Sequence, residues 1–184
     1  MRALGAALAL LALPASAGAA DGLWELLRAG GQVVLLPHAT TGGAPGDPAG
    51  FRLADCTTQR NLSAAGREEA RRIGRAFRAR RIPVASVMSS RWCRCLETAL
   101  LAFDRVEPWP ALDSFSDDLD REGAQSLAVR TLAGDRPAGG NVVLVTHPVN
   151  ITALTGATPA PGEMVILTPQ GAGEFKIAGR LLVR

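Results

Sequence analysis

Histidine, cysteine and lysine are scarce in this chain of 184 residues, which has two histidines, three cysteines and a single lysine. Three cysteines without a second closely spaced pair disfavour a zinc site. Beyond the N-terminal segment, no apolar run approaches the roughly 20 residues that a membrane-spanning helix needs. Internal repeats and low-complexity tails are also missing. We therefore expect one folded domain that needs no metal and does not span a membrane.

Arginine supplies almost all of the positive charge, because 19 of the 20 basic residues are arginine and the formal net charge is +3. This balance does not by itself imply nucleic acid as a partner, and we expect none. The densest basic stretch, residues 67–81, contains two acidic residues, and the residues interleaved with it have helical spacing: Gly66, Ala70, Ile73 and Phe77. The arginines are therefore predicted to form the solvated face of a helix. A patch that attracts anionic substrates is the alternative.

The N-terminus has the three parts of a secretory signal. Arg2 supplies a basic start, residues 3–13 are apolar, and a small-residue stretch with an Ala-x-Ala pattern follows. We predict a signal peptide over residues 1–20, cleaved between Ala17 and Asp21, and a folded domain over residues 21–184. The protein is then expected to be periplasmic or secreted. A retained N-terminal anchor is the alternative.

Each of the two histidines follows an apolar run. His38 comes after Gln32–Pro37, and His147 comes after Asn141–Thr146. Aliphatic runs without alternation are typical of strands buried on both faces in a parallel sheet. Ligands of open α/β sheets bind outside the carboxyl ends of the strands, so both imidazoles are predicted to face one crevice. Imidazole can serve there as a nucleophile or as an acid or base. The alternative is that the two histidines have no role.

A third apolar run, Val84–Met88, leads into another segment suited to anions. Ser89 or Ser90 is expected to cap the helix that follows, and free amide groups at a helix start favour an anion. Arg94, near that start, can donate two parallel hydrogen bonds to a phosphate group.

Helical and strand-like segments alternate along the chain. Helices are expected over residues 22–29, 63–80, 92–104 and 122–133, and strands over residues 32–37, 84–88, 141–145, 163–168 and 174–183, with a short edge strand within 107–112. The alternation predicts an α/β fold, a three-layer α/β/α domain with a mainly parallel central sheet. Antiparallel pairing of the last two strands would make the sheet mixed.

Four blocks, in this order, resemble the histidine phosphatase superfamily with its phosphoglycerate mutase-like fold. They are Leu35–Thr41, Asn61–Ala70, Ser89–Ala99 and Val145–His147. The resemblance extends from about Gln32 to the C-terminus. It implies phosphoryl transfer through a phosphohistidine intermediate.

The resemblance also implies roles for individual residues. His38 would attack phosphorus, while Arg94 and His147 would hold the phosphoryl oxygens. Thr41 matches the polar residue that follows the nucleophile and is a candidate for phosphate binding. No metal and no other cofactor is needed, because cationic side chains neutralise the charge. The substrate would be a small phosphorylated molecule.

Further site residues are expected on the loops. The family often takes its proton donor from the loop after the third strand, and Asp117 best fits that place, with Asp118 second. Arg60 and Asn150 are candidate pocket neighbours.

Residue 148 is proline where phytase-like relatives usually have an aspartate, which disfavours that branch. The signal peptide favours a phosphatase over a glycolytic mutase. The oligomeric state is left open.

One position departs from the family pattern. The arginine that normally precedes the nucleophilic histidine, and that holds phosphate, is replaced by Pro37, which has neither charge nor a backbone N–H. The chain is therefore expected to be an impaired phosphatase. The alternative is a catalytically degenerate protein that binds phosphate or a phosphorylated ligand.

The three cysteines allow one disulfide. Cys93 and Cys95 are two positions apart, so on a helix they point to different sides and cannot easily bridge. A bond would join Cys56 to one of them, which would tie the loop after His38 to the helix that carries Arg94. Three free thiols are the alternative.

Overall fold

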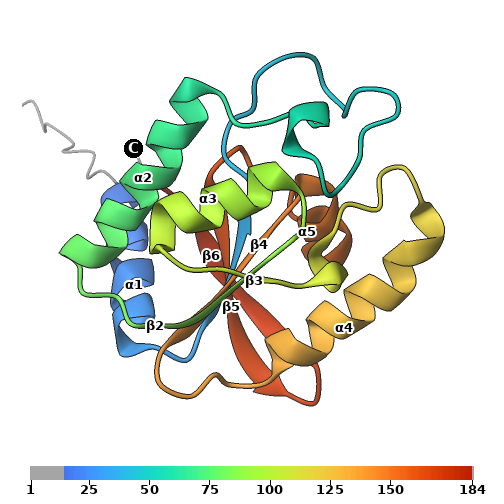
Figure 1. The fold of residues 1–184 in the computed structure, drawn as a ribbon. Helices are drawn as coiled ribbons and strands as arrows, with labels where there is room; N and C mark the ends of the chain where they lie inside the picture. The colour runs from blue at the N-terminus through green and yellow to red at the C-terminus, as the bar shows by residue number, and fades with distance from the viewer. Residues whose placement is uncertain (1–14, 184) are drawn as a thin grey trace, which may run out of the picture.

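The computed structural model describes residues 15–183, so the start of the predicted signal peptide, residues 1–14, lies outside the described residues. Its centre is a six-stranded sheet with the order β3-β2-β4-β1-β5-β6 (Figure 1). The strands are β1 Val33–Pro37, β2 Val84–Ser89, β3 Glu107–Pro108, β4 Asn141–Thr146, β5 Glu163–Gly171 and β6 Glu174–Leu182.

Strands β1 to β4 pair in parallel, and β5 and β6 pair antiparallel at one side of the sheet. The predicted mixed, mainly parallel sheet is confirmed. β1 and β4 lie side by side with Pro37 opposite Thr146, so the two apolar runs end at the same level. This register places the residues after both strands at one edge.

Five α-helices cover the sheet: α1 Ala15–Ala29, α2 Ala64–Ala79, α3 Cys93–Phe103, α4 Glu122–Gly134 and α5 Pro148–Thr155. Short 3₁₀ turns lie at Cys56–Thr58, Pro110–Leu112 and Leu119–Arg121. Helices α1, α2 and α3 pack against one face of the sheet, and α4 and α5 pack against the other. The chain therefore forms the predicted three-layer α/β/α architecture (Figure 1).

Alternate residues of the central strands face the two core clusters. Val34 and Leu36 of β1 pack among α1, α2 and α3, whereas Val33 and Leu35 pack among α4 and α5. Every residue of β1 is buried, which explains why its sequence shows no polar alternation.

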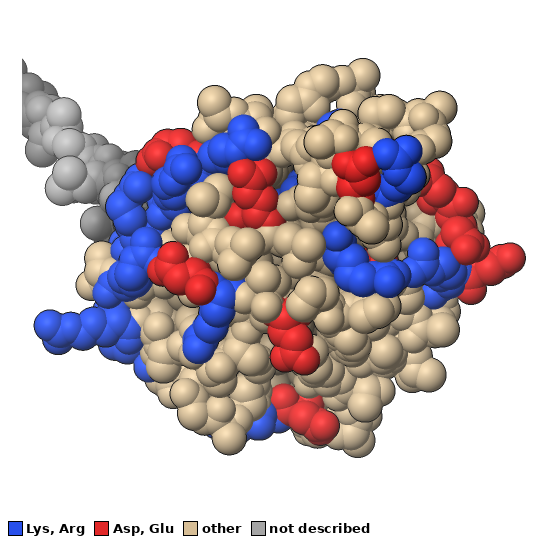
Figure 2. Space-filling view, in the orientation of Figure 1, with Lys and Arg blue, Asp and Glu red and all other residues tan. Residues whose placement is uncertain are grey.

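The basic stretch forms the outer face of α2, as predicted. Ser63 caps the helix by accepting a hydrogen bond from the amide of Gly66 at 3.0 Å. Arg71 and Arg75 are exposed and pair with Glu68, while Ile73 and Phe77 face the core. Figure 2 shows the blue arginines gathered over this helix with red acidic groups among them.

Several predicted boundaries were wrong. Helix α1 begins at Ala15 rather than Gly22, so it crosses the predicted cleavage region. Helix α3 begins at Cys93 with Trp92 in the N-cap position, so neither Ser89 nor Ser90 caps it. By contrast, the short edge strand predicted within residues 107–112 is confirmed as β3, and it is limited to Glu107–Pro108 because prolines at 108 and 110 remove backbone donors.

None of the helices in residues 15–183 is both long enough and apolar enough to cross a membrane.

Candidate active site

The two histidines meet at the carboxyl edge of β1 and β4. The amide of His38 donates to the carbonyl of Thr146 at 2.9 Å, which extends the parallel pairing by one residue. The ring centroids of His38 and His147 lie 5.5 Å apart in an edge-to-face arrangement. The two imidazoles predicted from the apolar runs therefore lie side by side at one edge of the sheet.

One ring nitrogen of His38 is held by the backbone. Nδ1 lies 2.9 Å from the carbonyl oxygen of Ala39, and because a carbonyl only accepts, Nδ1 carries the proton in the neutral ring. The lone pair is then on Nε2. Within residues 15–183, Nε2 has no hydrogen-bond partner. This tautomer leaves a nucleophilic nitrogen directed away from the backbone.

His147 has the opposite tautomer. Its Nδ1 lies 3.4 Å from Nη2 of Arg94, which can only donate, so Nδ1 accepts. Its Nε2 then carries the proton and donates to Oγ of Ser90 at 2.9 Å. Ser90 is 3.4 Å from a carboxylate oxygen of Asp113, which is fully buried and paired with Arg91. This chain of contacts fixes the His147 ring.

Arg94 is the cation closest to both rings, and its guanidinium is already paired. Its Nη1 donates to both carboxylate oxygens of Asp47, at 2.9 and 3.0 Å. The two side chains are only 5% and 6% exposed. The Nε of Arg94 is buried and has no hydrogen-bond partner among the described residues.

Arg60 brings a second guanidinium to the site. Its Nη1 contacts Oγ1 of Thr41, and its buried Nε has no partner among the described residues. Thr41 is therefore connected to the site by its hydrogen bond with Arg60. The positive charges of Arg60 and Arg94 both act on His38, so two cations influence this imidazole despite the proline at position 37.

Burial keeps both imidazoles neutral. It lowers the pKa of His38 to about 4, and the charges of Arg94 and Arg60 act in the same direction. Burial, Arg94, His38 and Arg60 lower the pKa of His147 well below its usual value. Near pH 7 both rings thus have a lone pair available.

A disulfide joins Cys56 to Cys93, which confirms one of the two predicted pairings and excludes three free thiols. It ties the loop after His38 to the start of α3, one residue before Arg94. Cys95 is a free, buried thiol, with its sulfur 3.6 Å from Nε2 of His147. Burial raises the pKa of Cys95 to about 12, so it stays protonated.

Asp117, the predicted proton donor, is exposed in the turn after Phe115. Sequence reasoning missed two other carboxylates, Asp47 and Asp113, which are buried against site residues. In the sequence, Asp113 directly follows the apolar Leu112 and is separated by three residues from the acidic group Asp117, Asp118 and Asp120.

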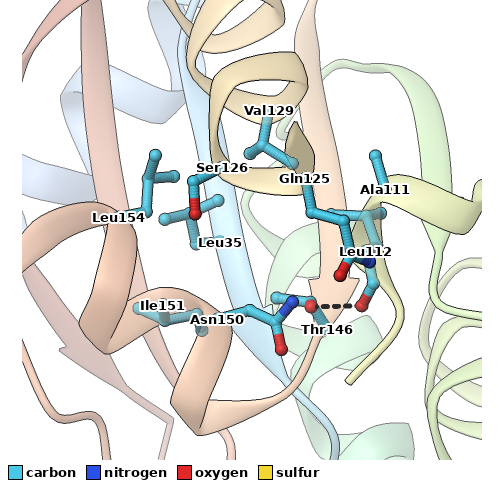
Figure 3. Close-up of a pocket in the computed structure, with 10 residues that line it drawn as sticks. All are labelled: Leu35, Ala111, Leu112, Gln125, Ser126, Val129, Thr146, Asn150, Ile151 and Leu154. Carbon is cyan, nitrogen blue, oxygen red and sulfur yellow. Dashed lines mark hydrogen bonds between the residues drawn. The ribbon is translucent and has the colours of Figure 1, made fainter. Parts of the chain in front are cut away.

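Asn150 does not face the two histidines. Its Nδ2 donates to the carbonyl of Asp113 at 2.8 Å, and its side chain lines a cavity of about 10 Å³ on the α4–α5 face (Figure 3). Gln125 also lines this cavity, and both amide oxygens have no partner in the described residues. The space fits about one water molecule and is too small for a substrate.

A larger groove opens on the loop that follows His38. It has a volume of about 430 Å³ and is lined by residues 42–48 together with Gln59, Arg60 and Asn61. Asp47 and Arg60 line this groove, and Asp47 also pairs with Arg94, so the groove adjoins the cluster around Arg94. No group of three or more potential metal ligands occurs in residues 15–183.

Solved structures show the same fold. The protein histidine phosphatase SixA in complex with tungstate matches with a TM-score of 0.61 and 18% identity over 82% of this chain and 96% of that one. A putative phosphohistidine phosphatase SixA from Agrobacterium tumefaciens matches with a TM-score of 0.56 and 21% identity, over 82% and 96%. The mycobacterial glucosyl-3-phosphoglycerate phosphatase Rv2419c in complex with VO3 matches with a TM-score of 0.58 and 16% identity, over 79% and 97%.

No family model matches this sequence, and no curated protein matches it. The fold predicted from the four sequence blocks is nevertheless confirmed by the solved structures, each of which is covered almost entirely. The chain has the phosphoglycerate mutase-like fold of the histidine phosphatase superfamily.

Proposed function

We propose that this protein is a phosphomonoester hydrolase that forms a phosphohistidine at His38. The observation that carries the proposal is the hydrogen bond from Nδ1 of His38 to the carbonyl of Ala39. It leaves the lone pair of Nε2 free beside Arg94 and Arg60. An activated nucleophile with cations at the developing charge is the arrangement that phosphoryl transfer needs.

The reaction has two steps. Nε2 of His38 forms a bond to phosphorus while the bond to the leaving oxygen breaks, and that oxygen takes a proton. Water then attacks phosphorus, the N–P bond breaks, and inorganic phosphate is released. Arg94 and Arg60 stabilise the equatorial oxygens, over which the transition-state charge spreads, and the neutral His147 orients Arg94 by accepting from its Nη2. Thr41 orients Arg60.

The donor to the leaving oxygen is proposed to be Asp117, with Asp118 second. Asp117→Asn should slow hydrolysis of alkyl phosphates, whose alkoxide leaves poorly, much more than hydrolysis of p-nitrophenyl phosphate, whose phenolate needs no proton. Equal effects on the two substrates would reject this assignment, and Asp118→Asn tests the second candidate in the same way.

A second candidate function is binding of phosphate or a phosphorylated ligand without turnover. Pro37 favours it, because the family's usual arginine is missing there. Arg60 argues for catalysis, because it brings a second guanidinium to His38. We propose that Arg60 supplies part of the charge that Pro37 lacks.

One experiment separates the two functions. The purified domain, residues 21–184, is mixed with a panel of phosphomonoesters in the presence of a chelator, and released phosphate and acid-labile phosphoenzyme are measured. We expect both for the unchanged protein and neither for His38→Ala. Measurable phosphate binding without turnover or label would instead favour the binder.

We further propose that the protein is exported, as the N-terminal signal pattern indicates. The disulfide between Cys56 and Cys93 supports this proposal, because disulfides persist mainly in oxidising compartments. Mass spectrometry of protein from its native host should show a first residue between Gly18 and Asp21. An intact Met1 on the mature protein would contradict the proposal.

A further inference from the structure

Asp47 occupies the phosphate-binding side of Arg94. Both of its carboxylate oxygens accept from Nη1 of Arg94. Oδ2 also accepts from the indole Nε1 of Trp92 at 3.0 Å, and Oδ1 accepts from the amide of Arg60 at 2.9 Å. A carboxylate and a phosphoryl group compete for the same guanidinium donors, because both present oxygens at matching spacing.

The charges of the site favour an exchange of one anion for the other. Arg60 and Arg94 contribute two positive charges, Asp47 contributes one negative charge, and both histidines are neutral near pH 7. A phosphoryl dianion balances the two arginines fully once Asp47 has left. With Asp47 in place, the dianion would face a buried like charge, which is unfavourable where the surroundings exclude water.

Donors for an incoming anion are already present. The Nε groups of Arg94 and Arg60 are buried and lack partners in residues 15–183. Buried N–H groups of charged side chains are rarely left unpaired in folded proteins. These two are therefore suited to oxygens of a bound ligand.

The segment that carries Asp47 can move without breaking the core. Gly43 and Gly46 have φ angles of +74° and +91°, and a Cβ at either position would meet nothing within 4 Å. Residues 43–46 are exposed. The far end of the loop is held by Cys56 in the disulfide to Cys93, so movement is confined to the glycine-rich part.

We propose that Asp47 is a positioning residue that competes with the substrate phosphoryl group for Arg94. It leaves Arg94 when a dianion binds, and it thereby sets the affinity and charge preference of the site. The inference rests on the proposed phosphate site around His38 and Arg94. Asp47 holds Arg94 in place when no substrate is present. Ligands too weakly charged to displace Asp47 are rejected.

The test measures binding of inorganic phosphate by calorimetry, so it needs no turnover. Asp47→Asn removes the competing charge but keeps one amide oxygen, which can still accept from the Arg60 amide or from Trp92, and should tighten phosphate binding by about tenfold or more. Asp55→Asn is the matched control, since Asp55 is a partly exposed carboxylate on the same loop that pairs with Arg52 rather than with Arg94, and should leave the affinity unchanged.

A double-mutant cycle shows whether Asp47 acts through Arg94. In an Arg94→Gln background, Asp47→Asn should no longer tighten phosphate binding. An equal gain in both backgrounds would mean that Asp47 acts by general charge rather than by occupying Arg94, and would overturn the proposal. Thermal unfolding of each variant confirms that it is folded.

A structural readout distinguishes displacement from simple repulsion. Titration of the unchanged protein with phosphate should strongly shift the indole N–H resonance of Trp92, which loses Asp47 as its acceptor, while Trp24 and Trp109 serve as internal controls. Phosphate binding without that shift, or weaker binding by folded Asp47→Asn, refutes the proposal and leaves the proposed phosphatase standing. Absence of phosphate binding in every variant overturns the phosphate site and this inference together, whereas turnover and label at His38 test the proposed function separately.

Discussion

The two histidines lie side by side, yet their surroundings differ. His147 is held at both ring nitrogens, by Arg94 and by Ser90, and a buried carboxylate lies behind Ser90. His38 is held at one nitrogen only, beside a glycine-rich loop. A nucleophile needs an unengaged lone pair, whereas a group that stabilises a transition state needs a fixed direction. The difference is consistent with the proposed reactive role of His38 and supporting role of His147.

The largest expected effect separates the two rings directly. His38→Ala should reduce turnover by roughly 10⁴-fold or more and abolish the phosphoenzyme, because it removes the covalent nucleophile. His147→Ala should leave a slower, weaker label on His38. The measurement is incubation with a labelled phosphodonor and rapid quench at alkaline pH. Label on His147 would reverse the assignment of roles.

The disulfide stabilises the loop on the His38 side, and its loss should have the next largest effect. It closes a loop with a sequence separation of 37, for which loop-closure entropy predicts about 4 kcal/mol of stability. The double substitution Cys56→Ser and Cys93→Ser should lower the unfolding free energy, measured by urea titration, by about 4 kcal/mol. A thiol reductant should match this loss in the unchanged protein and add nothing to the paired variant. Equal stability of oxidised and reduced protein would show that the loop is held by other contacts.

Acid should destabilise the protein through both rings. The folded pKa of His38, about 4, lies below its usual value of 6.5, so the unfolded state binds more protons between these values. The stability that depends on neutral His38 is fully present above pH 6.5 and is lost as the pH falls toward 4. The loss in unfolding free energy reaches roughly 3 kcal/mol. His147 acts in the same direction. The unfolding free energy, measured in urea between pH 7.5 and 4, should therefore depend less on pH in His38→Gln than in the unchanged protein. An equal pH dependence in both would show that His38 is not buried in its neutral form.

Restoring the family's arginine tests how well Arg60 replaces it. Pro37→Arg should raise turnover by up to about 10²-fold, because a preorganised charge donor is typically worth about that much. Thermal stability should stay about the same. Pro37→Leu, which adds no charge, is the control. If the unchanged protein is already as fast as Pro37→Arg, position 37 does not limit activity.

The smallest expected effect concerns the contact behind His147. Ser90→Ala removes the acceptor of the Nε2 proton and should cost about 1 kcal/mol of stability, with a few-fold loss of turnover. Nitrogen NMR of His147 should show a mixed tautomer in the variant and a protonated Nε2 in the unchanged protein. A uniform tautomer in both would mean that Arg94 alone orients the ring.

The sequence predicted the parts of the site that depend on local patterns. His38 and His147 were found because buried strands show up as aliphatic runs, and Arg94 because a short apolar run precedes it. Asp47 was missed because its role depends on a loop that folds back onto a helix 47 positions further on. A lone aspartate between glycine and proline has the appearance of an ordinary turn. The capping prediction for Ser90 was wrong because α3 begins only at Cys93, with Trp92 in the N-cap position.

The length of α1 bears on when the proposed export signal is removed. The predicted cleavage region falls inside a helix that begins at Ala15, whereas proteases cut exposed, unfolded chain. The side chains that hold this helix, Trp24 and Leu27, come after that region and are buried. Asn141 also donates to the carbonyl of Leu27 at 2.7 Å. Maturation is therefore expected to precede completion of α1, and the shortened helix keeps the buried Trp24 and Leu27 that dock it on the sheet.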